Sequence, residues 1–172
     1  MFTQFYNEAL RKLVIGFGSL FNDIRVVHKN SDGTTKETIR VPISYGPKEK
    51  FMRRISEMSS ITSTTRTEIT LPRFGFDITG MAYDPARKGN KLRVRSVSSE
   101  DGLSGSWNYS EVPYNINFGL YSFTRNQDDN LQIIEQVLPY FTPEFIVSFK
   151  VSSLNQKVDV PIILNGVSTV ED

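Results

Sequence analysis

The sequence predicts an α+β protein in which a mixed, mostly antiparallel sheet carries about three packed helices. Two observations predict this class. Apolar residues alternate with polar ones in several segments, as in half-buried strands, and recur every three or four residues in others, as on one helix face. Segment 112–145 shows both periods in succession, because it alternates through Ile116, Phe118 and Leu120 and then changes to helical spacing. With a returning strand over 145–151, it forms one packing unit around which the rest of the chain is organised.

The helix predicted within this segment has defined ends as well as an apolar stripe. Asn126 occupies the N-cap position, and Asp128 and Asp129 follow in the first turn, where carboxylates meet the positive end of the helix dipole. Pro139 and Pro143 end the helix, since proline lacks the N–H donor and restricts the residue before it. The stripe itself consists of Leu131, Ile134, Val137 and Leu138.

The remaining elements follow from the same patterns in chain order. We expect helices over residues 3–21 and 48–58, strands over 23–29, 35–45, 66–83, 93–97 and 158–164, and loops over 59–65, 84–92 and 98–106. Pro42 places an edge or a bulge in its strand, because it cannot donate to a ladder. Pro72 and Gly75 leave open whether their segment is one strand or two. Gly16 and Gly18 either weaken the first helix or permit close packing against a neighbour.

Composition excludes several classes of protein. At 172 residues, the chain fits one domain, 1–172, with a sizeable core. A net charge of +1 argues against a dedicated nucleic-acid binder, which usually carries a strong basic excess. No run of eighteen apolar residues and no clean signal peptide occur, so we expect no membrane association. The absence of cysteine excludes disulfides and thiolate metal sites.

The sequence gives little support for catalysis. It has no cysteine and one histidine, so a Ser-His-Asp triad would require His28, which we interpret as an exposed strand residue. Asp128 and Asp129 come closest to a metal cluster, but neighbouring helix positions do not face one site, and we interpret them as helix N-terminal charge. We therefore predict no catalytic, cofactor-binding or metal-binding residues and no enzyme. A small hydrolase with carboxylates from distant positions is the weakest alternative.

Two groups of basic residues are the candidate partner interface. They are Lys48, Lys50, Arg53 and Arg54 on the second helix, and Arg87, Lys88, Lys91, Arg93 and Arg95 around the long loop. Three interpretations stay open: solvated charge, contact with an acidic protein surface, or contact with DNA phosphate. No aromatic residue lies among residues 84–106, which disfavours binding of single-stranded nucleic acid.

Long ordered blocks at both ends of the chain resemble a known family. SFTRNQDD followed by LQIIEQVLPYFTPEF, and FYNEALRKL followed by IRVPISYGPKEKFMRRI, are similar to the tail sheath stabiliser and completion proteins, or tail terminators, of T4-type contractile-tailed bacteriophages. Residues 83–111 match weakly. The resemblance implies an α+β subunit of a hexameric ring, with no cofactor. Longer members carry a further C-terminal region, whose role cannot be transferred.

The resemblance also implies partners and a location. The ring would cap the contractile tail in the virion, after assembly in the host cytoplasm, and would stabilise the last sheath ring. Its partners would be the tail sheath protein, the tail tube or tube terminator protein, and the neck and head-completion proteins, with DNA passing through the ring. We expect the two basic groups and loop 98–106 to face outward, and edges such as 35–45 to pair across subunits. The alternative function is a DNA-contacting channel or neck component whose basic residues line the bore; steep salt dependence of DNA binding would favour it.

Overall fold

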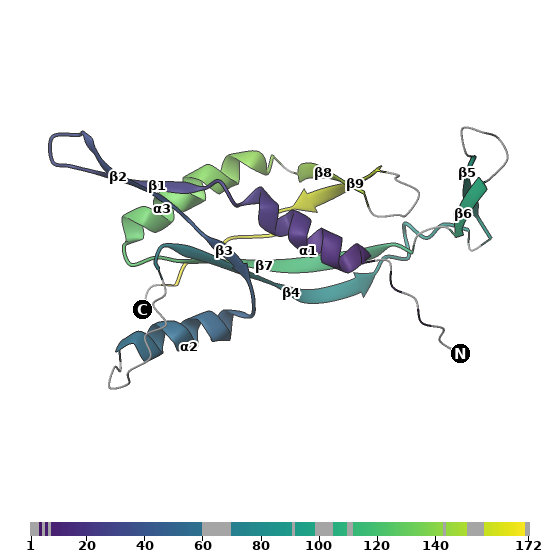
Figure 1. The fold of residues 1–172 in the computed structure, drawn as a ribbon, viewed down its shortest axis with the longest axis horizontal. Helices are drawn as coiled ribbons and strands as arrows, with labels where there is room; N and C mark the ends of the chain where they lie inside the picture. The colour runs from purple at the N-terminus through teal and green to yellow at the C-terminus, as the bar shows by residue number, and fades with distance from the viewer. Residues whose placement is uncertain are drawn as a thin grey trace.

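The computed structural model describes residues 4, 6, 8–59, 70–90, 92–98, 105–109, 112–142, 144–150 and 157–170 (Figure 1). In these ranges the helices are α1 (Ala9–Leu20), α2 (Lys48–Ser59) and α3 (Gln127–Val137), and a 3-10 turn (Leu138–Tyr140) follows α3. The strands are β1 (Arg25–Lys29), β2 (Thr35–Arg40), β3 (Ile43–Tyr45), β4 (Arg73–Tyr83), β5 (Val94–Ser98), β6 (Gly105–Tyr109), β7 (Tyr114–Phe123), β8 (Glu144–Lys150) and β9 (Lys157–Ile163).

The predicted α+β class and the mixed, mostly antiparallel pairing are confirmed. A central sheet has the order β3-β4-β7, with β3 parallel to β4 and β4 antiparallel to β7. The other described strands form the antiparallel pairs β1–β2, β5–β6 and β8–β9. In Figure 1, α1, α3 and the pairs β1–β2 and β8–β9 lie on one side of the central sheet, and α2 lies on the other. The described strands are therefore divided among four separate sheets, one of three strands and three of two.

Pro42 explains why the strand predicted over 35–45 is two strands, β2 and β3. Just before it, the Val41 N–H still donates to the Ile24 carbonyl (3.0 Å), which continues the pairing with the β1 side. At Pro42 the chain changes partner, because the proline carbonyl accepts from Phe74 N–H of β4 (2.8 Å) while proline has no N–H of its own. Val41 is fully buried at this crossing, so it ties the β1–β2 pair to the central sheet.

The core lies between α1, α3 and one face of the central sheet. Phe17 of α1 stacks on Phe118 of β7, with ring centroids 4.3 Å apart, and also contacts Phe76 of β4 at 5.4 Å. Aromatic pairs of this kind add to the stabilisation that comes from burying their apolar surface. The buried residues of this cluster are Phe17, Phe21, Val26, Val41, Phe74, Phe76 and Ile133.

Two glycines allow helices to approach their neighbours closely. A Cβ on Gly16 of α1 would overlap the ring of Phe149 on β8, which confirms that this glycine permits close packing. On the opposite face of the sheet, a Cβ on Gly75 of β4 would lie 2.6 Å from the Phe51 ring of α2. Phe51 is 4% exposed and its ring lies 5.5 Å from that of Phe123. The buried aromatic ring of Phe51 thus anchors α2 to the sheet.

The apolar stripe predicted for α3 is wrong in part. Leu131 is 50% exposed and Leu138 is 40% exposed, whereas Ile133 and Asp129 are buried. The helix is rotated because its polar side chains, described below, bind the edge of β1. Of the predicted stripe, Val137 does pack against the core.

Several boundaries differ from the predictions. The first helix begins at Ala9, β6 was not predicted, and Gly75 lies inside β4 without interrupting it. Most of loops 59–65 and 98–106, and Pro143, fall outside the described residues. Among the helices that the structure describes, none is long and apolar enough to cross a membrane.

We predict that Gly75→Ala lowers the free energy of unfolding by about 1–3 kcal/mol, because the added methyl forces the Phe51 ring away from β4. Gly80→Ala in the same strand is the matched control, since a Cβ there has only Asn117 Nδ2 nearby, at 3.7 Å. Chemical denaturation of both variants measures the difference. Equal stability of the two would contradict the anchoring of α2 through Phe51.

Candidate assembly surfaces

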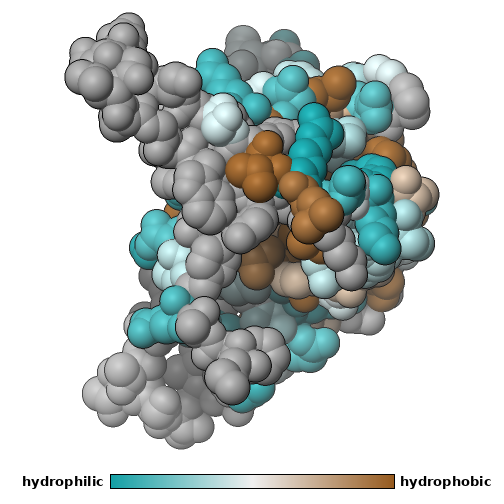
Figure 2. All heavy atoms as spheres, turned by 90° about the vertical axis from the view of Figure 1, so that its right-hand side faces the viewer, coloured by the Kyte–Doolittle hydropathy of each residue, from teal (hydrophilic) through white to brown (hydrophobic). Residues whose placement is uncertain are grey.

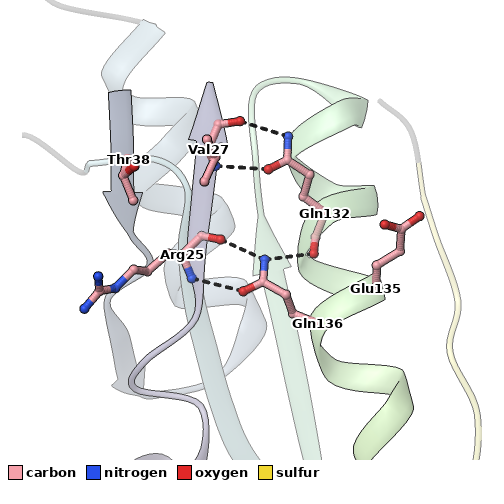
Figure 3. Close-up of a pocket in the computed structure, with 6 residues that line it drawn as sticks. All are labelled: Arg25, Val27, Thr38, Gln132, Glu135 and Gln136. Atoms are coloured by element: carbon pink, nitrogen blue, oxygen red, sulfur yellow. Dashed lines mark hydrogen bonds between the residues drawn. The ribbon is translucent and has the colours of Figure 1, made fainter. Parts of the chain in front are cut away.

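The edge of β1 is bound by two glutamine side chains of α3 (Figure 3). Gln132 Oε1 accepts from Val27 N–H at 3.0 Å, and its Nε2 donates to the Val27 carbonyl at 3.2 Å. Gln136, one turn later, does the same at Arg25, with distances of 3.3 and 2.7 Å. Each side-chain amide supplies a donor and an acceptor, as a neighbouring strand would. We call Gln132 and Gln136 the glutamine clamp.

One turn before the clamp, the same helix binds β1 through a hydrogen bond between two side chains. Asp129 is 4% exposed, and its Oδ1 lies 2.8 Å from His28 Nε2. The predicted exposure of His28 is therefore wrong, because this residue is half-buried. Asp128 and Asp129 do lie in the first turn of α3, as predicted, and Asp129 in addition binds His28. This contact could not be found from spacing, because the partners are 101 residues apart. A buried carboxylate with a hydrogen-bonded partner holds the two segments in register.

An open groove of about 450 Å³ runs beside the clamp. Its lining residues are Arg25, Val27, Thr38, Gln132, Glu135 and Gln136 (Figure 3). The amide groups of both glutamines are already engaged with β1, so they are not free to bind a ligand in the groove. Nor do the described residues contain three His, Asp or Glu side chains grouped to hold a metal ion. The contacts at this site thus hold α3 against β1.

The basic group on α2 is largely free of intramolecular partners. Lys48 lies with its Nζ 6.0 Å from the centroid of the Tyr121 ring, at the limit of a cation–π contact. Burial raises the pKa of Tyr121, as does its hydrogen bond to Asp77. Lys50, Arg53 and Arg54 are exposed, and the described residues give their side chains no ion pair. We call these three residues the α2 basic face.

The second basic group is partly engaged within its own loop. Arg87 Nε donates to Asp84 Oδ2 at 2.6 Å, and its Nη2 donates to Asn115 Oδ1. The bond from Arg87 holds the pKa of Asp84 below its usual value. Lys88 and Arg93 are exposed, whereas Lys91 and the side chain of Arg95 lie outside the described part. In Figure 1 this segment and α2 lie toward opposite ends of the molecule, so the structure does not bring the two basic groups together.

Apolar side chains are also exposed on the fold. Figure 2 shows them beside hydrophilic ones at the end of the molecule where α1 begins and β4 ends. Leu10 in the first turn of α1 and Met81 near the end of β4 are each 49% exposed. Tyr83 and Tyr114, which pair across β4 and β7, are 44% and 54% exposed. Exposed apolar groups gathered in this way are typical of surfaces that a partner covers.

We predict that Gln132→Leu speeds hydrogen exchange at the Val27 amide by about tenfold, because that N–H loses its acceptor. Glu135→Leu is the control: it makes a polar-to-apolar change on the exposed face of the same helix. Amide exchange followed by NMR resolves the two. An unchanged Val27 rate in Gln132→Leu would show that the clamp does not protect the β1 edge.

We further predict a coupling of about 1–3 kcal/mol between His28 and Asp129 in a double-mutant cycle with alanine. We expect His28→Ala to lower the free energy of unfolding more than Asp129→Ala does, because it leaves a buried carboxylate without its partner. Equilibrium unfolding of the two single variants and the double variant supplies the cycle. Additive effects would rule out a direct stabilising pair.

Comparison with known proteins assigns the chain to a family. The sequence profile of the T4-like virus Myoviridae tail sheath stabilisers matches residues 4–172. The tail completion protein gp15 of Enterobacteria phage T4 is 34% identical over 148 residues, which cover 84% of this chain and 53% of that protein. The chain therefore spans about half the length of this curated relative. With the profile matching nearly its whole length, the chain belongs to the family of T4-like virus tail sheath stabilisers.

Proposed function

We propose that this chain is a structural protein of the virion that caps a contractile tail. Six copies form a ring at the head-proximal end, stabilise the last sheath ring and join the tail to the neck. The observation that carries the proposal is the profile match across residues 4–172, supported by the identity to a protein named for tail completion. The partners we propose are the sheath protein, the tail tube or its terminator, and neck proteins, with DNA passing through the ring.

The distribution of exposed groups supports an assembling subunit. In the described part of the chain, few large apolar residues are fully buried, and many are between 38% and 85% exposed. Such surfaces favour association when partners cover them. The outer edge of β2 also has no described strand beside it, so its backbone groups can pair with another chain. We propose no catalytic step, since the contacts of Gln132, Gln136 and Asp129 described above hold α3 against β1.

The α2 basic face and the exposed members of the second basic group are proposed to contact acidic protein surfaces. Cations on a helix that is anchored through one side chain project from the sheet and can steer an oppositely charged partner. Contact with DNA is the alternative use of the same residues. The two uses differ in salt dependence and in the partner required.

We predict that light scattering of the purified protein gives a species near six times the 19.6 kDa chain, alone or bound to ends of polymerised sheath and tube. Added to such tails, it should slow loss of sheath from the ends. Polymerised tube without sheath is the control for nonspecific attachment. A monomer that ignores tails, yet binds duplex DNA with affinity falling steeply between low and moderate salt, would overturn the proposal and favour the DNA-contacting function.

A further inference from the structure

We propose that the ring closes through opposite charges on two helices: α2 of one copy packs against α3 of the next copy. The inference rests on the proposed ring and names the two surfaces that meet in it. One surface is the α2 basic face, Lys50, Arg53 and Arg54. The other is the α3 acidic stripe, which consists of Asp128, Leu131, Glu135 and Leu138.

The two helices carry opposite charge. The α2 sequence KEKFMRRISEMS has four basic and two acidic residues, whereas α3, QDDNLQIIEQV, has three acidic residues and no basic one. Of the α3 acids, Asp129 is engaged with His28, but Asp128 and Glu135 are exposed. None of the described cations forms an ion pair with either of them. Among the described residues these opposing charges have no ion-pair partner, while Asp128 Oδ2 accepts a hydrogen bond from Gln132 Nε2 at 2.9 Å.

Each surface also has apolar groups among its charges. Met52, next to the α2 basic face, is 41% exposed, because Phe51 turns inward and leaves it on the flank of the helix. In the α3 acidic stripe, Leu131 is 50% exposed and Leu138 is 40% exposed, and the spacing of three, four and three residues aligns all four members. Apolar groups at the centre with charges around them are the usual composition of a specific interface.

The position of the helices favours a contact that propagates. Phe51 anchors α2 on the face of the central sheet that holds Gly75 and Phe123, while Ile133 places α3 in the core on the opposite face. Figure 1 shows the two helices on opposite sides of the sheet. Two surfaces on opposite sides of the sheet cannot contact one another within one copy of the chain. A contact between them in different copies is heterologous, the type that generates a ring when its rotation closes.

Charge exchange tests this pairing. In one variant, Arg53→Glu with Arg54→Glu makes α2 acidic; in the other, Asp128→Lys with Glu135→Lys makes α3 basic. Each variant alone opposes like charges at every contact, so we expect the dissociation constant of the ring to rise about tenfold or more. A 1:1 mixture can alternate around an even-membered ring with every contact attractive. We expect it to assemble within about threefold of the original protein.

The control is Lys29→Glu with Lys157→Glu, two exposed lysines; it changes net charge as much as the α2 variant but leaves both helix surfaces intact. It should assemble normally. Sedimentation or light scattering measures assembly, alone and with tail ends, and circular dichroism confirms folding. If the α3 variant fails to fold, Glu135→Lys replaces it.

Because the chain has no cysteine, Arg54→Cys with Glu135→Cys gives a second measurement. Oxidation of this double variant should yield disulfide-linked multimers, whereas oxidation of Lys88→Cys with Glu135→Cys should not.

The outcomes separate this inference from the proposed function. A ring that forms with the original chain and with both reversed variants alike would overturn the helix pairing and leave the capping function standing. Reversed variants that fail alone and in the mixture would also overturn it. If the original chain forms no oligomer either in solution or on tail ends, the ring itself is wrong, and the pairing with it.

Discussion

The glutamine clamp is the constraint on which the rest of the fold depends. The β1–β2 pair is not part of the central sheet, and an isolated two-stranded ribbon is marginally stable in water. Gln132 and Gln136 supply the hydrogen bonds that a third strand would have provided, and Asp129 adds a side-chain hydrogen bond with His28. The clamp also protects that edge from pairing with other chains, whereas the outer edge of β2 stays open.

The clamp determines which face of α3 reaches solvent. Because Gln132 and Gln136 must face β1, the helix is rotated so that Leu131 and Glu135 point away from the core. The attachment of α3 to β1 therefore exposes the surface that we propose a neighbouring copy contacts. The same relation holds for α2: of the side chains from 48 to 56, Phe51 is the buried one and most of the others are exposed. A subunit whose core is small and whose helices are held by few contacts gains stability from neighbours that cover them.

Periodicity and turn chemistry predicted the fold class, most strands and the three helices, because these patterns are local. Pro42 predicts an edge or a bulge within one strand, whereas in the structure the strand ends there and the chain changes sheet, because proline has no N–H. The orientation of α3 could not be predicted, since the hydrogen bonds that fix it join residues more than a hundred positions apart. The basic groups were visible in the sequence, but their separation in space, and the engagement of Arg87 with Asp84, depend on tertiary structure.

Electron cryomicroscopy of tails capped by this protein tests the central claim most directly, because it shows both the ring and its contacts. We predict six copies at the head-proximal end, with density connecting α2 of each copy to α3 of the next around the whole ring. A ring in which these two helices face solvent or the sheath, or tail ends that carry no ring of this chain, would contradict the account.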